Sequence, residues 1–322
     1  MASPRVKAPW MKGEPATEVR HIDAESISTA ARLLAAGEAV AVPTETVYGL
    51  AADATNGAAI ARIYAAKQRP AFNPLIVHVA SLDEAEHHAE FSELARSLAT
   101  RFWPGPLTLV LPRRQTSSIA SLASAGLPTL ALRVPNHPAM QALLAATDLP
   151  LAAPSANASG RISPTRAEHV LANLGGRIPL ILDGGRTLVG IESTIIGISG
   201  EKARLLRAGP LTPEELGINL EEAGSTIEAP GQLQSHYAPA KPVRIDATQA
   251  RDGEWLIGFG AIEGNASLSR DGDLVEAAAR LFDMLHEAEA APSSSIAVAP
   301  VPDEGLGRAI NDRLRRAAAP RI

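Results

Sequence analysis

The feature that most constrains the fold is a repeated alternation of short apolar segments with segments whose apolar residues recur at helical spacing. The apolar segments predict strands over residues 18–22, 38–42, 75–79, 106–111, 128–134 and 178–182. Helices are predicted over residues 26–36, between the cap Asn56 and the terminator Pro70, and over residues 137–146 and 164–174. Two further strands between residues 189 and 207 would pair through the Ser199-Gly200 turn. We therefore predict an α/β fold with a twisted mixed sheet and flanking helices.

The regular pattern stops between residues 221 and 242, where Gly, Pro, Gln and Ser become frequent. A chain of 322 residues exceeds the usual size of one domain. Beyond the break, strands are predicted over residues 255–259 and 295–299, and helices over residues 271–289 and 307–318. We expect a larger domain over residues 1–220, a linker over residues 221–242, and a small Rossmann-like α/β domain over residues 243–322.

The composition excludes several classes of protein. A net charge of −5 argues against a standing nucleic-acid partner, whose phosphates need a basic face. With no cysteine there is no disulfide framework, thiolate metal site or cysteine nucleophile. No apolar run approaches the roughly 20 residues that span a bilayer, and residues 1–20 do not resemble a signal peptide. We expect a cytoplasmic protein.

Polar side chains recur where successive predicted strands begin or end, which is where open α/β sheets bind their ligands. Lys67, Arg69 and Asn73 directly precede the strand at residues 75–79, and Arg133 ends the strand at residues 128–134. Further polar groups lie in residues 43–50, 154–157, 163–165, 192–196 and 205–209. We predict one ligand site built from these segments.

Each of these residues also has a purely structural explanation. Lys67 and Arg69 fall at the carboxyl end of a predicted helix, where cations stabilise the helix dipole. Ser163 precedes Pro164 and is expected to cap a helix, to bind a ligand, or both. His78 lies in an apolar strand, where a lone histidine is more often a core residue. Arg133 is expected to bind a carboxylate, or to form a salt bridge with Glu45 or Glu192.

Two other features of the sequence bear on phosphate binding and on metal binding. The chain has no Gly-x-x-x-x-Gly-Lys-Ser/Thr loop, so bound ATP would depend on Arg69, Asn73 and Arg207 for phosphate recognition. His87 and His88 are adjacent on a predicted helix and have no second cluster at ligand spacing. We therefore expect no protein metal site.

Four motifs together carry a family resemblance. They are Lys67-x-Arg69-Pro70-x-x-x-Pro74-Leu75, the triplet 155–157 (Ser-Ala-Asn), the triplet 193–195 (Ser-Thr-Ile), and the linker that contains His236 and Tyr237. In this order and spacing the chain resembles the L-threonylcarbamoyladenylate synthases, the YrdC-like family, in the long form with a carboxyl-terminal domain. The resemblance extends from about Val19 to the final helix.

The resemblance implies a nucleotidyltransferase, an enzyme that makes threonylcarbamoyladenylate and pyrophosphate from L-threonine, bicarbonate and ATP. This is the first step of the tRNA threonylcarbamoyladenosine modification. The implied ATP-binding residues are Arg69, Asn73, Thr129, Ser155, Ser163, Arg207 and Tyr237. The implied threonine-binding residues are Thr46, His78, Arg133, Ala153 and Ser193. Lys67 and Arg69 would act by positioning and charge neutralisation, with no covalent nucleophile, and Mg²⁺ would accompany ATP.

The resemblance also implies a hand-off of product to tRNA threonylcarbamoyl transferase proteins, with no membrane contact and no strong direct binding of nucleic acid. Residues 221–242, with Tyr237, are expected to act as a lid. Two alternatives stay open. One is a non-catalytic RNA-binding module of the same fold. The other is a carbamoyl phosphate enzyme like the related hydrogenase-maturation domain, whose relatives carry cysteine-rich zinc modules that this chain lacks.

Overall fold

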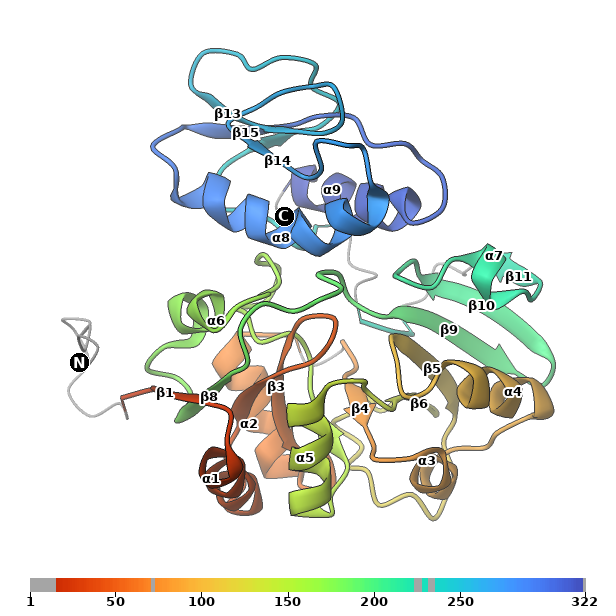
Figure 1. Ribbon diagram of the computed structural model, residues 1–322. Coiled ribbons are helices and arrows are strands. Elements are labelled where there is room, and N and C mark those ends of the chain that lie inside the picture. Colours follow the sequence, from red (N-terminus) through yellow and green to blue (C-terminus); the bar gives the residue numbers. More distant parts are fainter. Residues whose placement is uncertain (1–15, 71–72, 223–227, 231–234, 321–322) are drawn as a thin grey trace.

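The computed structural model describes residues 16–70, 73–222, 228–230 and 235–320. These residues form an eleven-stranded and a four-stranded sheet, each with its own helices (Figure 1). We refer to residues 16–222 as the large unit and to residues 243–320 as the small unit. The predicted mixed α/β fold with a second, smaller α/β unit is confirmed. No helix in the described ranges is long and apolar enough to cross a membrane.

The large sheet mixes parallel and antiparallel neighbours. Its strands are β1 (Glu18–His21), β2 (Val40–Pro43), β3 (Tyr48–Asp53), β4 (Ile76–His78), β5 (Leu107–Pro112), β6 (Thr129–Arg133), β7 (Leu151–Ala152), β8 (Leu180–Asp183), β9 (Thr194–Ser199), β10 (Lys202–Arg207) and β11 (Leu220–Glu222). Their order is β1-β8-β2-β3-β7-β4-β6-β5-β9-β10-β11. β9 and β10 form the predicted hairpin, although its loop is Gly200-Glu201, one residue beyond the predicted Ser199-Gly200.

Helices cover the two faces of the large sheet unequally. One core cluster contains residues of α2 (Gly57–Lys67), α3 (Leu82–His88), α4 (Glu93–Phe102) and α6 (Ala167–Leu174). The opposite cluster contains residues of α1 (Ala24–Ala35) and α5 (Pro138–Thr147), packed on β2, β3, β7 and β8. The short helix α7 (Pro213–Leu216) follows β10. The second face above β4, β6, β5 and β9 is therefore left for other segments to cover.

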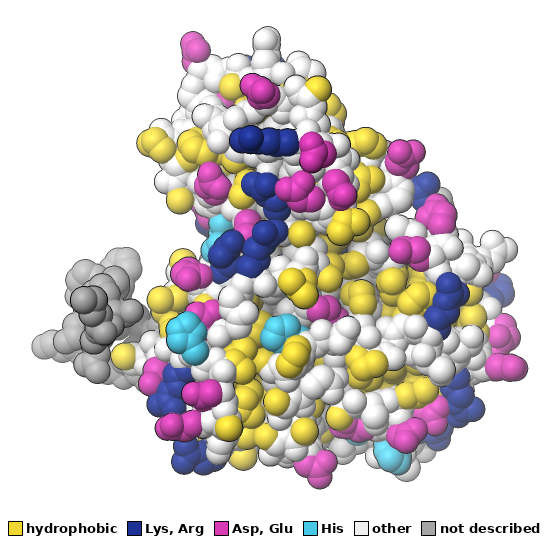
Figure 2. Space-filling view, in the orientation of Figure 1, with side chains coloured by type: hydrophobic (Ala, Val, Ile, Leu, Met, Phe, Trp, Pro, Cys, Tyr) yellow, Lys and Arg dark blue, Asp and Glu magenta, His cyan; other side chains and the backbone are white. Residues whose placement is uncertain are grey.

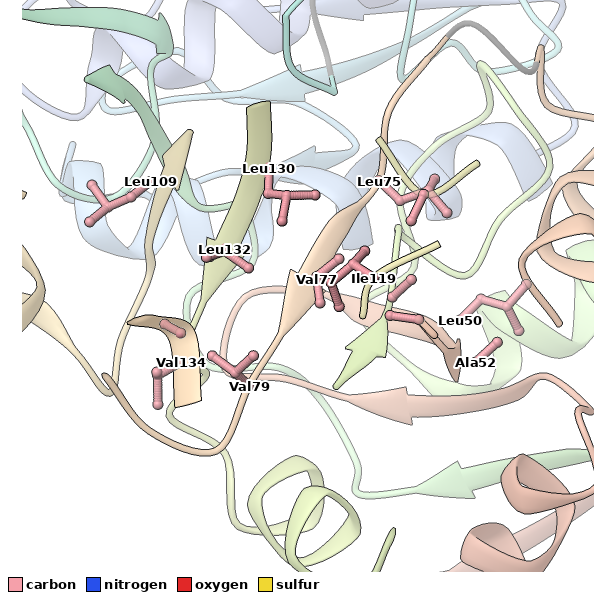
Figure 3. Packing of buried hydrophobic residues seen from close by; sticks show 14 of the residues in the cluster. Leu50, Ala52, Leu75, Val77, Val79, Leu109, Ile119, Leu130, Leu132 and Val134 are labelled. Atoms are coloured by element: carbon pink, nitrogen blue, oxygen red, sulfur yellow. The ribbon is translucent and has the colours of Figure 1, made fainter. Parts of the chain in front are cut away.

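Alternation along the central strands assigns their side chains to these two faces. Leu75, Val77 and Val79 pack beside Leu130 and Leu132 in the first core cluster (Figure 3). The alternate residues of the same strands point to the second face. They are Ile76 and His78 on β4, and Ala131 and Arg133 on β6. A histidine and an arginine are thus placed on the part of the second face that α1 and α5 do not cover.

The small unit has an all-parallel sheet in the order β12-β15-β13-β14. Its elements are β12 (Val243–Arg244), β13 (Glu254–Gly258), β14 (Ala266–Ser267), α8 (Leu274–Ala290), β15 (Ser295–Val298) and α9 (Gly307–Ala318). Both helices lie between this sheet and the large unit (Figure 1). Their core cluster includes Val47, Ile162 and Ile191 of the large unit, so one apolar cluster joins the two units.

Three details of the sequence-based prediction are wrong. Helix α6 begins at Ala167, and Ser163 does not cap it because its hydroxyl donates instead to Glu192 (2.5 Å). No strand was predicted over residues 43–50, which contain the start of β3, whose Tyr48 pairs with Pro43 of β2. Part of the predicted linker, up to Glu222, is in β11. Residues 223–227 and 231–234 of that linker lie outside the described ranges.

Candidate active site

A buried cavity of about 40 Å³ lies on the second face of the large sheet, beyond α1 and α5. Nine of the sequence-predicted site residues line it: Thr46, Arg69, His78, Arg133, Ala153, Ser155, Ser193, Arg207 and Tyr237. They come from strand ends and loops that are far apart in sequence, as the strand-end rule predicts. The structure therefore brings most of the predicted residues together.

Arg133 and His78 reach the cavity because their strands are in register. β4 and β6 are parallel, and His78 is the direct cross-strand neighbour of Arg133. Burial and the positive charge of Arg133 lower the pKa of His78 to about 3, so this imidazole is neutral at physiological pH. Its Nδ1 has no hydrogen-bond partner among the described residues. A neutral histidine with a free ring nitrogen is able to bind a polar ligand group.

The Arg133 guanidinium is held from three sides. Its Nε donates to the carbonyl of Gly105 (3.1 Å), and its Nη1 donates to Thr46 Oγ1 (3.0 Å). Its Nη2 lies 2.6 Å from Glu45 Oε1, as an ion pair without hydrogen-bond alignment. The salt bridge with Glu45 that the sequence left open is therefore present. It does not exclude ligand binding, because Arg133 also lines the cavity.

Arg207 and Ser193 form a second fixed pair. Arg207 Nε donates to the Ser193 carbonyl and its Nη2 to Ser193 Oγ, both at 3.0 Å. A β-bulge between Leu205 and Arg207 re-aims the end of β10, as bulges near functional sites often do. The chain after Arg207 passes so close to β9 that a Cβ on Gly209 would lie 2.4 Å from the Thr194 nitrogen. Only glycine fits there, and the tight turn fixes Arg207 beside Ser193.

Arg69 and Asn73 follow the end of α2. The helix ends at Lys67 because Gln68 adopts a left-handed conformation, with φ of 52°. Arg69 then donates to the carbonyls of Asn73 (3.3 Å) and Pro74 (3.0 Å). Burial lowers the pKa of Arg69 to about 10, and the guanidinium remains charged at neutral pH. The Asn73 amide is buried, and neither its nitrogen nor its oxygen has a partner among the described residues.

The structure does not bring four of the predicted residues to the cavity wall. Lys67 is buried, and its Nζ donates to the carbonyls of Ser155 and, at 2.5 Å, Asn157. Burial, followed by repulsion from Arg69, lowers the pKa of Lys67 well below its usual range. Thr129 starts β6, at the opposite end of the strand from Arg133. Ser163 and Asn73 are buried near the cavity but do not line it.

The described linker residues cover the cavity. Pro230, His236 and Tyr237 line it, and Ala229 packs on the same sheet face. Tyr237 is fully buried, and its backbone has a φ of 60°, which is unusual for an aromatic residue. Its hydroxyl has no partner among the described residues. A strained residue with an unpaired buried hydroxyl is typical of a functional segment.

The sequence did not identify Thr44, Glu192 or His236 as ligand-binding residues, although all three line the cavity. Glu192 accepts a hydrogen bond from Ser163 and pairs with Arg313 Nε (3.2 Å). His236 is buried, and its pKa is well below its usual range because of burial and then the charge of Arg69. His236 lies next to a predicted residue in the linker motif, which was the one available signal.

Charge dominates the chemistry of this cavity. Arg69, Arg133 and Arg207 all line it, whereas Glu192 is the one acidic side chain among its described lining residues. Such a cavity favours carboxylate and phosphate groups, which match the donor fork of arginine. No group of three or more His, Cys, Asp or Glu side chains in the described ranges is arranged to hold a metal ion.

Comparison with known proteins identifies the family. Residues 32–209 match a family model described as "Telomere recombination", which groups Sua5, YciO and YrdC proteins. Residues 198–319 match the model of the threonylcarbamoyl-AMP synthase C-terminal domain. The threonylcarbamoyl-AMP synthase of Bacillus subtilis is 39% identical, over 92% of this chain and 94% of its own length. The chain belongs to the threonylcarbamoyl-AMP synthase family.

Other members of the threonylcarbamoyl-AMP synthase family agree in sequence and structure. The threonylcarbamoyl-AMP synthase of Pyrococcus abyssi is 40% identical, over 94% of this chain and 96% of its own length. A crystal structure of Pyrococcus abyssi Sua5 with L-threonine superposes with a TM-score of 0.85 and 37% identity, covering 94% of this chain and 97% of that one. The family and enzyme class predicted from the sequence are confirmed.

Proposed function

We propose that the cavity between Arg69, Arg133 and Arg207 is where this enzyme joins L-threonine, bicarbonate and ATP. The convergence of three buried guanidinium groups on one cavity carries the proposal. Threonine brings one carboxylate and ATP brings a triphosphate, so the site needs fixed positive charge at more than one point. The reaction is the first step of the threonylcarbamoyladenosine modification of tRNA.

Arg133, Thr46 and His78 are proposed to bind threonine. Arg133 is already oriented by Gly105, Thr46 and Glu45, so little side-chain entropy is lost when it pairs with a carboxylate. Neutral His78 next to it is able to bond the amine or hydroxyl of the substrate without repelling Arg133. Ala153 and Ser193 line the same cavity, and the family resemblance assigns them to threonine.

Arg69, Asn73, Ser155, Arg207 and Tyr237 are proposed to bind ATP. The unpaired amide of Asn73 and the unpaired hydroxyl of Tyr237 are buried donors that a ligand would satisfy. Thr129 and Ser163 retain this role only as predictions from the family resemblance. Lys67 is proposed to act indirectly, because its bonds to the carbonyls of Ser155 and Asn157 shape that loop.

The chemistry follows from positioning. The threonine nitrogen attacks the carbon of bicarbonate and water is lost, which gives a carbamate. A carbamate oxygen then attacks the α-phosphorus of ATP, and the bond from that phosphorus to the departing pyrophosphate breaks. No protein nucleophile is required, and the guanidinium groups stabilise the developing charge.

Mg²⁺ is proposed to accompany ATP. Glu192, the one carboxylate among the described lining residues, already bonds Ser163 and Arg313. The phosphate oxygens of ATP, together with water molecules, would therefore be most of the Mg²⁺ ligands.

Substrate entry requires the linker to move. A cavity of 40 Å³ holds about one water molecule, far less than ATP needs. Pro230, His236 and Tyr237 of the linker form part of its wall. We propose that residues 221–242 act as a lid between domains of residues 1–220 and 243–322, and that closure keeps water from the carbamate.

The product is proposed to pass to tRNA threonylcarbamoyl transferase proteins in the cytoplasm, where ATP and tRNA are available. Strong direct binding of nucleic acid is not expected of this chain. Basic and acidic side chains are interspersed on the face shown in Figure 2, and the net charge is −5. A phosphate backbone requires a continuous basic surface.

Pyrophosphate release tests the proposed function. The purified chain should release pyrophosphate from ATP only when threonine and bicarbonate are both present, and omission of either should abolish release. Dependence on carbamoyl phosphate instead of threonine would favour the carbamoyl phosphate alternative. A gel shift with tRNA in the absence of any turnover would favour the RNA-binding alternative.

A further inference from the structure

Arg313 is a fully buried arginine that enters the large unit from the small one. It lies on α9, where Ala309, Ile310, Leu314 and Ala317 form the buried face, and its exposed fraction is 0%. An arginine at such a core position stays charged and must be paired. Figure 1 shows α9 on the side of the small sheet that faces the large unit.

Its guanidinium joins the two segments of the large unit that flank the β9 and β10 hairpin. Arg313 Nε pairs with Glu192 Oε2 at 3.2 Å, and Nη2 donates to the Glu192 carbonyl at 3.4 Å. Nη1 donates to the Ala208 carbonyl. The guanidinium carbon also lies 5.6 Å from the centre of the Tyr237 ring, within the range of a cation–π contact.

Besides Ala309 and Asp312 on its own helix, Arg313 has partners next to residues that are assigned to ATP. Glu192 Oε1 accepts a hydrogen bond from Ser163, and Glu192 itself lines the cavity. Ala208 directly follows Arg207, which is assigned to ATP, whereas Ser193, which is assigned to threonine, has no hydrogen bond with Arg313 among the described residues. Tyr237 lines the cavity from the linker. Arg133 on the threonine side is oriented by Gly105, Thr46 and Glu45, and these three residues form no hydrogen bond or ion pair with Arg313 in the described part of the chain.

We propose that Arg313 is a positioning residue for ATP, through which the small unit completes the nucleotide side of the active site. It fixes Glu192, Ala208 and Tyr237 at once, and thereby sets Ser163, Arg207 and the Tyr237 ring relative to one another. The inference rests on the proposed function of the cavity. It gives α9 a part in substrate recognition in addition to the stability that its packing supplies.

Arg313→Lys separates positioning from folding. Lysine keeps the positive charge next to Glu192. It lacks the planar guanidinium that bonds Glu192 and Ala208 at the same time and lies near the Tyr237 ring. The apparent KM for ATP should rise about tenfold, while the KM for threonine should stay within about twofold. Arg315→Lys on the same helix is the matched control, because Arg315 pairs only with Asp303 in an exposed salt bridge. Both of its KM values should match those of the unaltered chain.

A second variant covers the case in which Arg313→Lys does not fold. Arg313→Met combined with Glu192→Gln removes both charges, so no unpaired charge is buried. Its KM for ATP should exceed that of Glu192→Gln alone. The reference protein is the unaltered chain for Arg313→Lys and Glu192→Gln for the double variant. If the folded variant has a KM for ATP within about twofold of that of its reference protein, the inference is overturned. Equal increases in the KM for ATP and the KM for threonine, together with a lower melting temperature, would also overturn it, because they would show that Arg313 only stabilises the fold.

Calorimetric titration with ATP keeps this inference separate from the proposed function. If the unaltered chain releases no threonine-dependent pyrophosphate, the proposed function fails. Weaker ATP binding by Arg313→Lys than by Arg315→Lys would still support the role of Arg313. Equal ATP binding by the two variants would contradict it.

Discussion

His78 and Arg133 are direct cross-strand neighbours in parallel strands, and both side chains face the same buried cavity. Burial, and then the positive charge of Arg133, lower the pKa of His78 to about 3, so a neutral imidazole lies beside a charged guanidinium. This pair defines the end of the cavity where a carboxylate and an adjacent polar group are bound together.

Replacement of Arg133 by Ala should mainly impair the use of threonine. The apparent KM for threonine should rise by about tenfold or more, since a charge-assisted bidentate contact contributes roughly 1.5–3 kcal/mol, while the KM for ATP should change little. Because the change leaves the Glu45 carboxylate buried without its partner, Arg133→Ala should also be made together with Glu45→Gln. Equal increases for threonine and ATP in that double variant would indicate a structural salt bridge.

Arg69→Ala tests the phosphate end. Loss of one charge-assisted contact should lower threonine-dependent pyrophosphate release by about tenfold or more. Arg62→Ala is the matched control on the preceding helix, because Arg62 pairs with Glu38 at the surface. Steady-state assays at saturating threonine give the comparison, and near-normal turnover by a folded Arg69→Ala protein would defeat the assignment.

The stability of the protein should fall in acid partly because of His78. The unfolded chain binds a proton near pH 6.5, whereas the folded chain keeps His78 neutral down to about pH 3. More protons are bound in the unfolded state across this window, so one such group removes up to about 1.4 kcal/mol of stability per pH unit as the pH falls. Urea unfolding of the unaltered chain and of His78→Gln between pH 7 and pH 4 measures the difference. Parallel pH profiles would show that His78 takes up its proton in the folded state.

The linker should become harder to cut when the substrates are bound. Threonine, bicarbonate and ATP together should slow proteolysis between residues 221 and 242, because a closed lid is a poor protease substrate. Cleavage is followed by gel electrophoresis, with threonine alone and ATP alone as controls. A cleavage rate that no ligand combination changes would contradict the lid.

Local sequence rules predicted the parts of the site that depend on strand ends. Arg133, Ser193 and Arg207 lie in segments that were predicted to form the site because polar residues next to strand ends tend to meet at one edge of the sheet, whereas His78 was assigned through the family resemblance. The helix signals placed the terminator of α2 at Pro70, close to its observed last residue, Lys67.

The remainder depends on contacts between segments distant in sequence. Lys67 was expected to face phosphates, but its carbonyl partners lie about ninety residues further along the chain. Ser163 was expected to cap a helix, to bind a ligand, or both, and its hydroxyl donates to Glu192 across the fold instead of capping α6. Arg313 carried one local signal, its place on the apolar face of α9, which is visible only once that helix is known to be buried.

The most direct test of the central claim uses ¹³C-labelled bicarbonate. The purified chain is incubated with ATP, L-threonine and the label, and the product is measured by mass spectrometry together with pyrophosphate. One labelled threonylcarbamoyladenylate should form for each pyrophosphate released, and Arg133→Ala and Arg69→Ala should lower both yields together. Pyrophosphate release without threonine, or an adenylate product that carries no ¹³C, would contradict the account.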